Sequence, residues 1–495
     1  MNVGLPVVVI GAGPVGLAAA AHLLERGLTP LVLEAGDTVG AGMLRWAHVR
    51  MFSPWEFAID RAAGALLARH GWEAPDPARF PTGGEVVERY LAPLAAAPEI
   101  APHLRIGARV VAVAKQRRDR MKDLKRNDVP FVVRYEDATG EHEVLAQAII
   151  DASGTIEHPN PMGASGVPAL GERSLQPHIF YGMPDVLDAH RDRYAGKRVL
   201  VVGSGHSAFN VLSDLARLSR QMPGMRIEWA IRRPSLHRVL GGGENDQLRE
   251  RGKLGLTIKQ LVDDGVLQVT TNFHLDRLER TDEGIVAYSE DKALPPVDEI
   301  VGATGFRPDP GLLSELRIAL DHGTQAPVAL APLIDPNQHS CGSVRPHGAE
   351  ELKHPDANVY IVGMKSYGRA PTFLLLTGYE QVRSVVAAIA GDWEAARRVE
   401  LVLPETGVCV TQFLEEDAAA PAAATSCCGS TAKAEAVAAT PPPIEAATGC
   451  CGGPAPAGVE ACCVQDADAK AQGKSGCGCG PSPAPAAPRT TSCCT

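Results

Sequence analysis

Cysteine is almost absent from most of this chain. Of the 12 cysteines among its 495 residues, only Cys341 and Cys409 precede residue 426. A core held together by disulfides is therefore excluded, and a reducing compartment is the expected environment. Because these two cysteines are single and far apart, the chain before residue 426 also lacks the close dithiol pair that a conventional disulfide reductase requires.

A surplus of positive charge is also missing. The chain has 48 Lys and Arg against 58 Asp and Glu, which gives a formal net charge of −10 and a pI near 5.9. This balance argues against electrostatic binding of nucleic acid. The 45% hydrophobic and 21% charged residues are typical of a globular enzyme, and the length predicts two or three domains.

The segment from Leu5 to Leu24 contains no Asp, Glu, Lys or Arg and has the length of a membrane span. No basic residue precedes it, it is interrupted by three glycines, and it begins with a β-branched run at residues 7–10. We therefore expect a buried strand, a glycine loop and a buried helix, with no membrane partner. No targeting signal is recognised, so a cytoplasmic location is expected.

Two similar strand–glycine loop–helix units stand out along the chain. The first covers residues 6–26 with a further strand at 30–34, and the second runs from residue 197 to 231. A helix is expected at 372–390, and other strands at 131–135, 144–151, 298–305 and 358–363, the last two returning to the first domain. The pattern predicts an α/β fold with two Rossmann-like dinucleotide-binding domains.

The first glycine loop has Gly11, Gly13 and Gly16 between a strand and a helix. The first glycine permits a tight turn, the second lets the backbone approach a pyrophosphate, and the third lets the helix pack on the strand. The helix N-terminus supplies free N–H groups and a partial positive charge. Glu34 closes the next strand, where a carboxylate accepts hydrogen bonds from a ribose. The unit predicts a bound dinucleotide.

The second loop repeats this arrangement with Gly203, Gly205 and Ser207, and has alanine at the third small position. The strand that follows ends in Arg232 and Arg233 rather than in an acid. Guanidinium groups at this point suit the 2′-phosphate of NADPH. The alternative is that these arginines only coat the surface. No side chain in the chain is assigned a catalytic role.

Two such units in one chain indicate electron transfer from a nicotinamide to a flavin. With the segments Asp151-Ala152-Ser153-Gly154 and Ala303-Thr304-Gly305-Phe306-Arg307-Pro308, the chain resembles the two-dinucleotide-domain flavoproteins, and among them the flavin-containing monooxygenases. The resemblance spans roughly residues 5–400. It implies FAD at the first loop, NADPH at the second, a small-molecule substrate and dioxygen. It also places four further residues beside the cofactors: Asp151, Gly154, Gly305 and Gly363.

The chain departs from these families at two points. The Phe-x-Gly-x-x-x-His stretch that flavin-containing monooxygenases carry before the second loop is absent, and residues 177–185 read PHIFYGMPD instead. Met364 follows Gly363, where relatives of glutathione reductase have an aspartate. The first departure concerns oxygen transfer more than cofactor binding, and the second favours the monooxygenases.

The expected organisation has four parts. Residues 1–160 form the first part of an FAD-binding domain, 161–300 an NADPH-binding domain, and 301–415 the second part of the FAD-binding domain. Residues 416–495 form a disordered tail with paired cysteines, in which Ala, Pro, Gly, Ser, Thr and Cys dominate. Such a composition cannot bury enough apolar surface to offset its conformational entropy.

The tail holds ten cysteines in five close pairs, which suit soft ions such as arsenite, Cu(I), Hg(II) or Zn(II). The C-x2-C spacing is absent and no histidine follows His354, so a structural zinc module is not expected. The alternative is a low-complexity extension with incidental cysteines. The candidate ligands are Cys427, Cys428, Cys450, Cys451, Cys462, Cys463, Cys477, Cys479, Cys493 and Cys494.

Cysteine pairs on such a flavoprotein resemble the flavin monooxygenase-like proteins of bacterial arsenic-resistance operons. The resemblance implies an NADPH-dependent FAD oxidoreductase, a monooxygenase that oxygenates a soft nucleophile, with a trivalent arsenical captured by the tail as the substrate. Two alternatives stay open. One is an NADPH-dependent flavin reductase that passes electrons to the tail dithiols, and the other is a thiol-rich metal- or metalloid-binding protein on a flavoprotein scaffold.

Overall fold

The computed structural model describes residues 4–236, 239–240, 249–337, 346–370 and 374–401. Contacts divide the chain into two units, residues 1–418 and 419–495, and all described residues belong to the first. All twelve cysteines lie outside the described residues. The predicted thiol site in the tail therefore stays a prediction.

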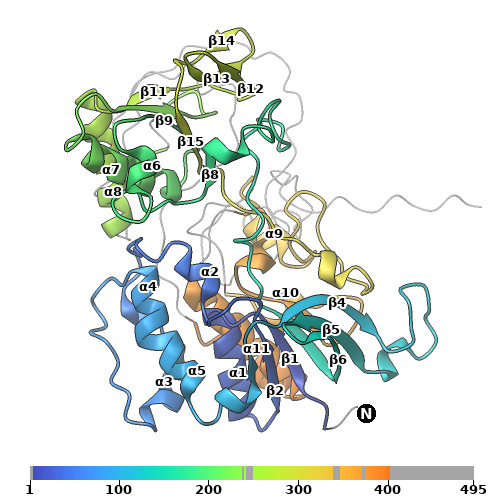
Figure 1. Cartoon of the computed structure of the whole chain (residues 1–495). Coiled ribbons are helices and arrows are strands. Elements are labelled where there is room, and N and C mark those ends of the chain that lie inside the picture. The colour runs from blue at the N-terminus through green and yellow to red at the C-terminus, as the bar shows by residue number, and fades with distance from the viewer. Residues whose placement is uncertain (1–3, 237–238, 241–248, 338–345, 371–373, 402–495) are drawn as a thin grey trace, which may run out of the picture. The chain divides into compact units, whose positions relative to one another are not determined.

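A five-stranded parallel sheet carries the first glycine loop (Figure 1). Its strand order is β16-β7-β1-β2-β3, so β1 is central, and all four pairings are parallel. β1 and β7 are buried along their whole length, which suits apolar strands covered on both faces. The strands are β1 (Val7–Ile10), β2 (Pro30–Leu33), β3 (Leu104–Arg105), β7 (Ala148–Asp151) and β16 (Val359–Ile361).

The helix α1 (Pro14–Glu25) begins directly after the first glycine loop. Gly13 is its N-cap and Pro14 its first residue, where a missing N–H costs nothing. A run of buried alanines at residues 18–21 lets α1 pack closely on α3 (Arg61–Ala68) and α11 (Leu375–Ile389). The N-terminus of α1 therefore meets the carboxyl end of β1, and its first turn contains no acidic residue.

The second glycine loop lies on another five-stranded parallel sheet, of order β11-β10-β9-β15-β8. The helix α7 (His206–Ser219) follows β9, and α8 (Arg249–Asp263) precedes β11. The strands are β8 (Ile179–Tyr181), β9 (Arg198–Val202), β10 (Arg226–Ala230), β11 (Gln268–Thr270) and β15 (Glu299–Gly302).

One expected strand lies in the other sheet. We expected residues 298–305 to return to the first domain, and this was wrong, because β15 pairs with β9 and β8 of the second sheet. β15 occupies the side of β9 that β10 leaves open, where Val199 and Val201 are fully buried. The other strand expected to return, now β16, does join the first sheet beside β7.

The segment expected as a single strand at 144–151 contains two. β6 pairs antiparallel with β5, whereas β7 joins the parallel sheet beside β1. The chain changes sheet at Gln147, whose backbone N–H donates to Pro6 O and whose side chain donates to Leu5 O at 2.6 Å. The antiparallel sheets are β4 (Arg109–Lys115), β5 (Phe131–Asp137) and β6 (Gly140–Ala146), and β12 (Arg277–Thr281), β13 (Gly284–Ser289) and β14 (Lys292–Ala293).

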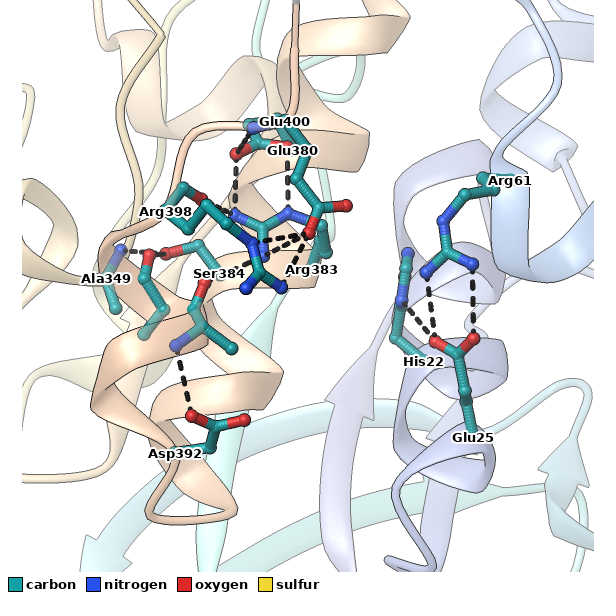
Figure 2. A network of polar contacts seen from close by, with 12 residues as sticks. His22, Glu25, Arg61, Ala349, Glu380, Arg383, Ser384, Asp392, Arg398 and Glu400 are labelled. Carbon is teal, nitrogen blue, oxygen red and sulfur yellow. Dashed lines mark hydrogen bonds and ion pairs between the residues drawn. The ribbon is translucent and has the colours of Figure 1, made fainter.

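Polar networks join the helices that cover the first sheet (Figure 2). The buried guanidinium of Arg383 on α11 binds Glu380 and the carbonyl of Ala395. Ser384 accepts a hydrogen bond from Ala349 N–H, which joins α11 to α10.

The remaining helices are short: α2 (Ala41–Leu44), α4 (Gly83–Val86), α5 (Ala92–Ala96), α6 (Arg191–Tyr194), α9 (Ala331–Ile334), α10 (Ala349–Leu352) and α12 (Trp393–Arg397). In the described part of the chain, no helix has the length and apolarity to cross a membrane.

Candidate functional site: two glycine turns and one cavity

The first glycine turn is closed by contacts that only glycine permits. Gly11 has a φ of +97°, and a Cβ there would lie 2.8 Å from the carbonyl oxygen of Ala152. At Gly16 a Cβ would lie 1.9 Å from the oxygen of Gly11. Gly13 differs, because nothing lies within 4 Å of the position that its Cβ would take. Open space beside the N-cap of α1 is what a closely approaching phosphate needs.

Glu34 is tied to the loop that it follows. One carboxylate oxygen accepts a hydrogen bond from Ala12 N–H at 2.6 Å, and the other accepts one from Gly36 N–H at 2.8 Å. The carboxylate therefore stands at the end of β2, beside the glycine turn at the end of β1. This is the position at which a sugar hydroxyl of a nucleotide could donate to it.

A cavity of about 910 Å³ opens beside these groups. It brings together six of the predicted residues, four from the two glycine units and two from other segments: Gly11, Gly13, Glu34, Ser207, Gly154 and Gly363. The other predicted cofactor residues do not line it: Gly16, Asp151, Gly203, Gly205, Arg232, Arg233 and Gly305.

The second glycine turn repeats the geometry of the first. Gly203 has a φ of +136°, and a Cβ there would lie 2.2 Å from the carbonyl oxygen of Ala303. Gly205 is the N-cap of α7, and nothing lies within 4 Å of its missing Cβ. Both glycine units therefore have one glycine at a tight turn and one glycine beside open space.

Arg232 and Arg233 follow Ile231, the first residue after β10, at the carboxyl edge of the second sheet. Arg232 is exposed and donates to the carbonyl of Ala164 at 3.3 Å. The carbonyl of Arg233 accepts a hydrogen bond from Asn272 N–H. Both arginines thus follow the strand next to β9, and their predicted role in binding the 2′-phosphate of NADPH stays a prediction.

The two chain crossings between the sheets are joined to each other. Asn160 N–H donates to Gly305 O at 2.9 Å, and Thr304 Oγ1 donates to Asn160 O at 2.6 Å. The Asn160 side chain donates to the carbonyls of Thr304 and Phe306 and accepts from Arg307. Gly305 therefore holds a turn with a φ of +82° in this joint.

Other groups of the cavity wall lie outside the predicted cofactor residues, and of these sequence reasoning missed Lys365. Trp46, Met51 and Phe52 line it, and the Phe52 ring lies 5.1 Å from the ring of His206 at the start of α7. Lys365 also lines it. The partners of Phe52 and Lys365 are distant in sequence, so no local spacing predicts these contacts. Among the described residues, no group of three or more His, Asp or Glu side chains could hold a metal ion.

Two parallel sheets, each with a glycine turn at a helix N-terminus, define the class of two-dinucleotide-fold oxidoreductases. A family model described as pyridine nucleotide-disulphide oxidoreductase matches residues 8–329. The chain belongs to this family. The predicted fold class is confirmed, and the prediction of an FAD- and NADPH-dependent oxidoreductase is confirmed at the level of the family.

Curated relatives are flavin monooxygenases. Indole-3-pyruvate monooxygenase YUCCA1 from Oryza sativa subsp. japonica is 29% identical over 212 residues, 42% of this chain and 45% of that protein. Flavin-containing monooxygenase FMO GS-OX-like 2 from Arabidopsis thaliana is 24% identical over 266 residues, 48% of this chain and 52% of that protein. The chain spans about half the length of these relatives. The predicted resemblance to flavin-containing monooxygenases is confirmed, whereas that to arsenic-operon proteins stays a prediction.

Solved structures share the fold. Bacillithiol disulfide reductase from Bacillus cereus aligns with a TM-score of 0.57 and 20% identity, over 78% of this chain and 99% of that one. The cadaverine monooxygenase DfoA from Erwinia amylovora, in a structure bound to FAD, aligns with a TM-score of 0.57 and 16% identity, over 83% of this chain and all of that one (100%). One fold thus serves a reductase and a monooxygenase, so the fold does not choose between them.

Proposed function

We propose that this chain is a monooxygenase that holds FAD at the Gly11 turn and is reduced by NADPH at the Gly203 turn. The observation that carries the proposal is a cavity that is lined by Gly11, Gly13 and Glu34 at one unit and by His206 and Ser207 at the other. A hydride passes directly between two cofactors only if their rings meet, and a shared cavity provides the place.

The residues present fit FAD. The N–H groups at the start of α1 are available to a pyrophosphate, with open space at Gly13, and Glu34 would accept a hydrogen bond from a ribose hydroxyl. FAD held there would supply the transfer of two electrons from NADPH to dioxygen, so that one oxygen atom goes to the substrate and the other forms water with two protons.

The chain's own contribution around the flavin is to exclude water. Trp46, Met51 and Phe52 line the cavity, and a large apolar wall protects a reactive oxygen species from hydrolysis and leakage. A reductase that passes electrons to a disulfide needs a cysteine pair beside the flavin instead. Before residue 426 the sequence has only Cys341 and Cys409, which are far apart and form no close pair. This contrast supports the monooxygenase over the reductase.

We further propose a trivalent arsenical as the soft nucleophile that the enzyme oxygenates, captured by the ten tail cysteines. The support is the sequence of the tail, because paired thiolates bind soft ions tightly. The reaction balances when the trivalent arsenical, dioxygen, NADPH and one proton give the pentavalent oxide, NADP⁺ and water.

The test follows NADPH oxidation and oxygen uptake by the full chain, with and without methylarsenite or arsenite. Substrate-dependent oxygen uptake with one pentavalent product formed per NADPH is the expected result. Stimulated NADPH oxidation that yields only hydrogen peroxide would overturn oxygen transfer. If neither arsenical stimulates NADPH oxidation, the proposed substrate is wrong, but the proposed cofactors are not affected.

A full-length variant with all ten tail cysteines changed to serine separates the roles of core and tail. We expect it to keep maximal turnover but to need at least about tenfold more arsenical, because only capture is lost. If the wild-type protein instead oxidises NADPH without oxygen and gains tail thiols, the reductase alternative is correct. The fold shared with bacillithiol disulfide reductase is the observation that keeps this alternative in view.

A further inference from the structure

A buried ammonium group lies in the cavity wall. Lys365 is 3% exposed and lies in the short helix η8 (Gly363–Tyr367), directly after β16. Its Nζ donates to Asp151 Oδ2 at 2.7 Å and to Ser153 Oγ at 2.9 Å. An ammonium group has three N–H donors, so these two bonds leave one for a further acceptor. Because Lys365 lines the cavity, that acceptor can belong to a bound molecule.

Asp151 differs from Lys365 in its relation to the cavity. Its side chain is fully buried and does not line the cavity. Oδ1 accepts from the backbone and the hydroxyl of Ser153, at 3.1 and 2.6 Å, and Oδ2 accepts from Lys365. The carboxylate is thus satisfied by the protein alone. Any effect of Asp151 on a ligand must pass through its neighbours.

The helix η8 is held in place by a second set of buried hydrogen bonds. Gln381 of α11 accepts from Gly363 N–H at 2.7 Å and donates to Ser366 Oγ at 2.9 Å, while Ser366 Oγ donates to Gly363 O. Gly363 has a φ of +67°, and a Cβ there would lie 3.3 Å from Val15 of the first turn of α1. Lys365 is therefore anchored to a segment that touches the helix N-terminus of the first glycine turn.

Charge makes the two halves of this ion pair unequal. A dinucleotide brings a pyrophosphate anion into the cavity, and a buried carboxylate nearby repels it unless a cation compensates. Lys365 supplies that cation from the cavity side. Removing the lysine leaves two anions facing each other, whereas removing the aspartate leaves a cation that the ligand itself can neutralise.

We propose that Lys365 is a positioning residue for the dinucleotide at the Gly11 turn: its ammonium group compensates Asp151 and donates its remaining N–H to the bound cofactor. This inference rests on the proposed FAD site. A purely structural ion pair predicts something different, because both partners would then matter equally and a neutral replacement of the pair would be harmless.

The experiment compares K365M, D151N and the double variant D151N/K365M in apoprotein titrations with FAD, followed by flavin fluorescence. We expect K365M to raise the FAD dissociation constant by about 10- to 100-fold, which is the value of one charge-assisted hydrogen bond. D151N stays within about threefold of the wild type. The double variant recovers the thermal stability of the apoprotein, and its FAD affinity lies between those of K365M and the wild type, because the uncompensated carboxylate is gone but the donated hydrogen bond is still missing.

Two outcomes would overturn the role of Lys365. The first is an equal rise of the FAD dissociation constant in K365M and D151N. The second is wild-type FAD affinity in the double variant. The double variant also provides the test if K365M alone fails to fold. Lys353, whose exposed Nζ pairs with Glu350 at 2.7 Å, provides the control K353M with unchanged affinity. A wild-type protein that does not bind FAD would instead overturn the proposed function itself.

Discussion

Near the C-terminal end of α1, His22 lies buried against Asp60, with 3.0 Å between Nε2 and Oδ2. Its Nδ1 lies 3.4 Å from Oε2 of Glu25 (Figure 2). Burial by itself would lower the pKa of His22, but the hydrogen bonds to Asp60 and Glu25 outweigh it and raise the pKa to about 9. The unfolded chain has a pKa near 6.5. The stabilisation is therefore fully present below pH 6.5 and is lost as the pH rises through about 9.

We expect the free energy of unfolding of the wild type to fall by roughly 2–3 kcal/mol between pH 6.5 and about 9.5, relative to H22Q. Urea unfolding at the two pH values measures it. The control is H70Q, because His70 pairs with Glu99 at 2.8 Å on the surface and its loss should leave the pH dependence intact. A wild type and an H22Q variant with the same pH dependence would contradict the assignment.

Residues of this kind are beyond sequence reasoning for a physical reason. His22 is paired with a carboxylate 38 positions away, and Lys365 with one 214 positions away. Neither distance in sequence carries a periodic signal, because the fold alone brings the partners together. Gly11 and Glu34, in contrast, could be chosen from the sequence because the turn that needs them is formed within one strand–loop–helix unit.

At the scale of elements, the local units were predicted well and their partners less so. The sequence places β1, α1, β9 and α7 correctly, since each unit begins with a buried apolar run and a glycine turn. β15 was assigned to the wrong sheet because a short apolar strand fits either sheet by composition. Only the pairing of β15 with β8 and β9 decides which sheet it joins. That pairing forms between residues that are at least 100 positions apart, such as Glu299 and Val199.

The second glycine turn allows a matched test of two glycines in one element. G203A forces a side chain into a φ of +136° and to 2.2 Å from Ala303 O, so we expect it to destabilise the protein by at least about 1–3 kcal/mol. G205A has a φ of −89° and open space, so the apoprotein should tolerate it. Its methyl group occupies the space that a phosphate needs, which raises the KM for NADPH about tenfold or more.

Thermal unfolding of the apoprotein and steady-state kinetics with NADPH separate these two effects. G203A should lower Tm, and G205A should change KM with an unchanged Tm. If G205A binds NADPH like the wild type, the nucleotide does not approach this turn, and the second unit needs another explanation.

At the scale of the whole molecule, the net charge of the chain bears on how the second glycine unit can bind NADPH. The chain has a net charge of −10, and NADPH is more negative than NADH by its 2′-phosphate. A negatively charged protein repels the additional phosphate unless cations are concentrated where it binds. Arg232 and Arg233 are the cations that follow β10, and Arg232 is exposed to solvent. We therefore expect any preference for NADPH to depend on this local concentration of positive charge.

The variant R232S/R233S tests this reversal. We expect its KM for NADPH to rise about 10- to 100-fold while the KM for NADH changes little, because only the 2′-phosphate loses its charge-assisted hydrogen bonds. In the wild type, the preference for NADPH should weaken as salt is added, and in the variant it should not depend on salt. The control R217S removes another exposed arginine, paired with Asp214 on α7, and should keep both properties. Equal losses with NADPH and NADH would show that the two arginines serve the fold rather than the phosphate.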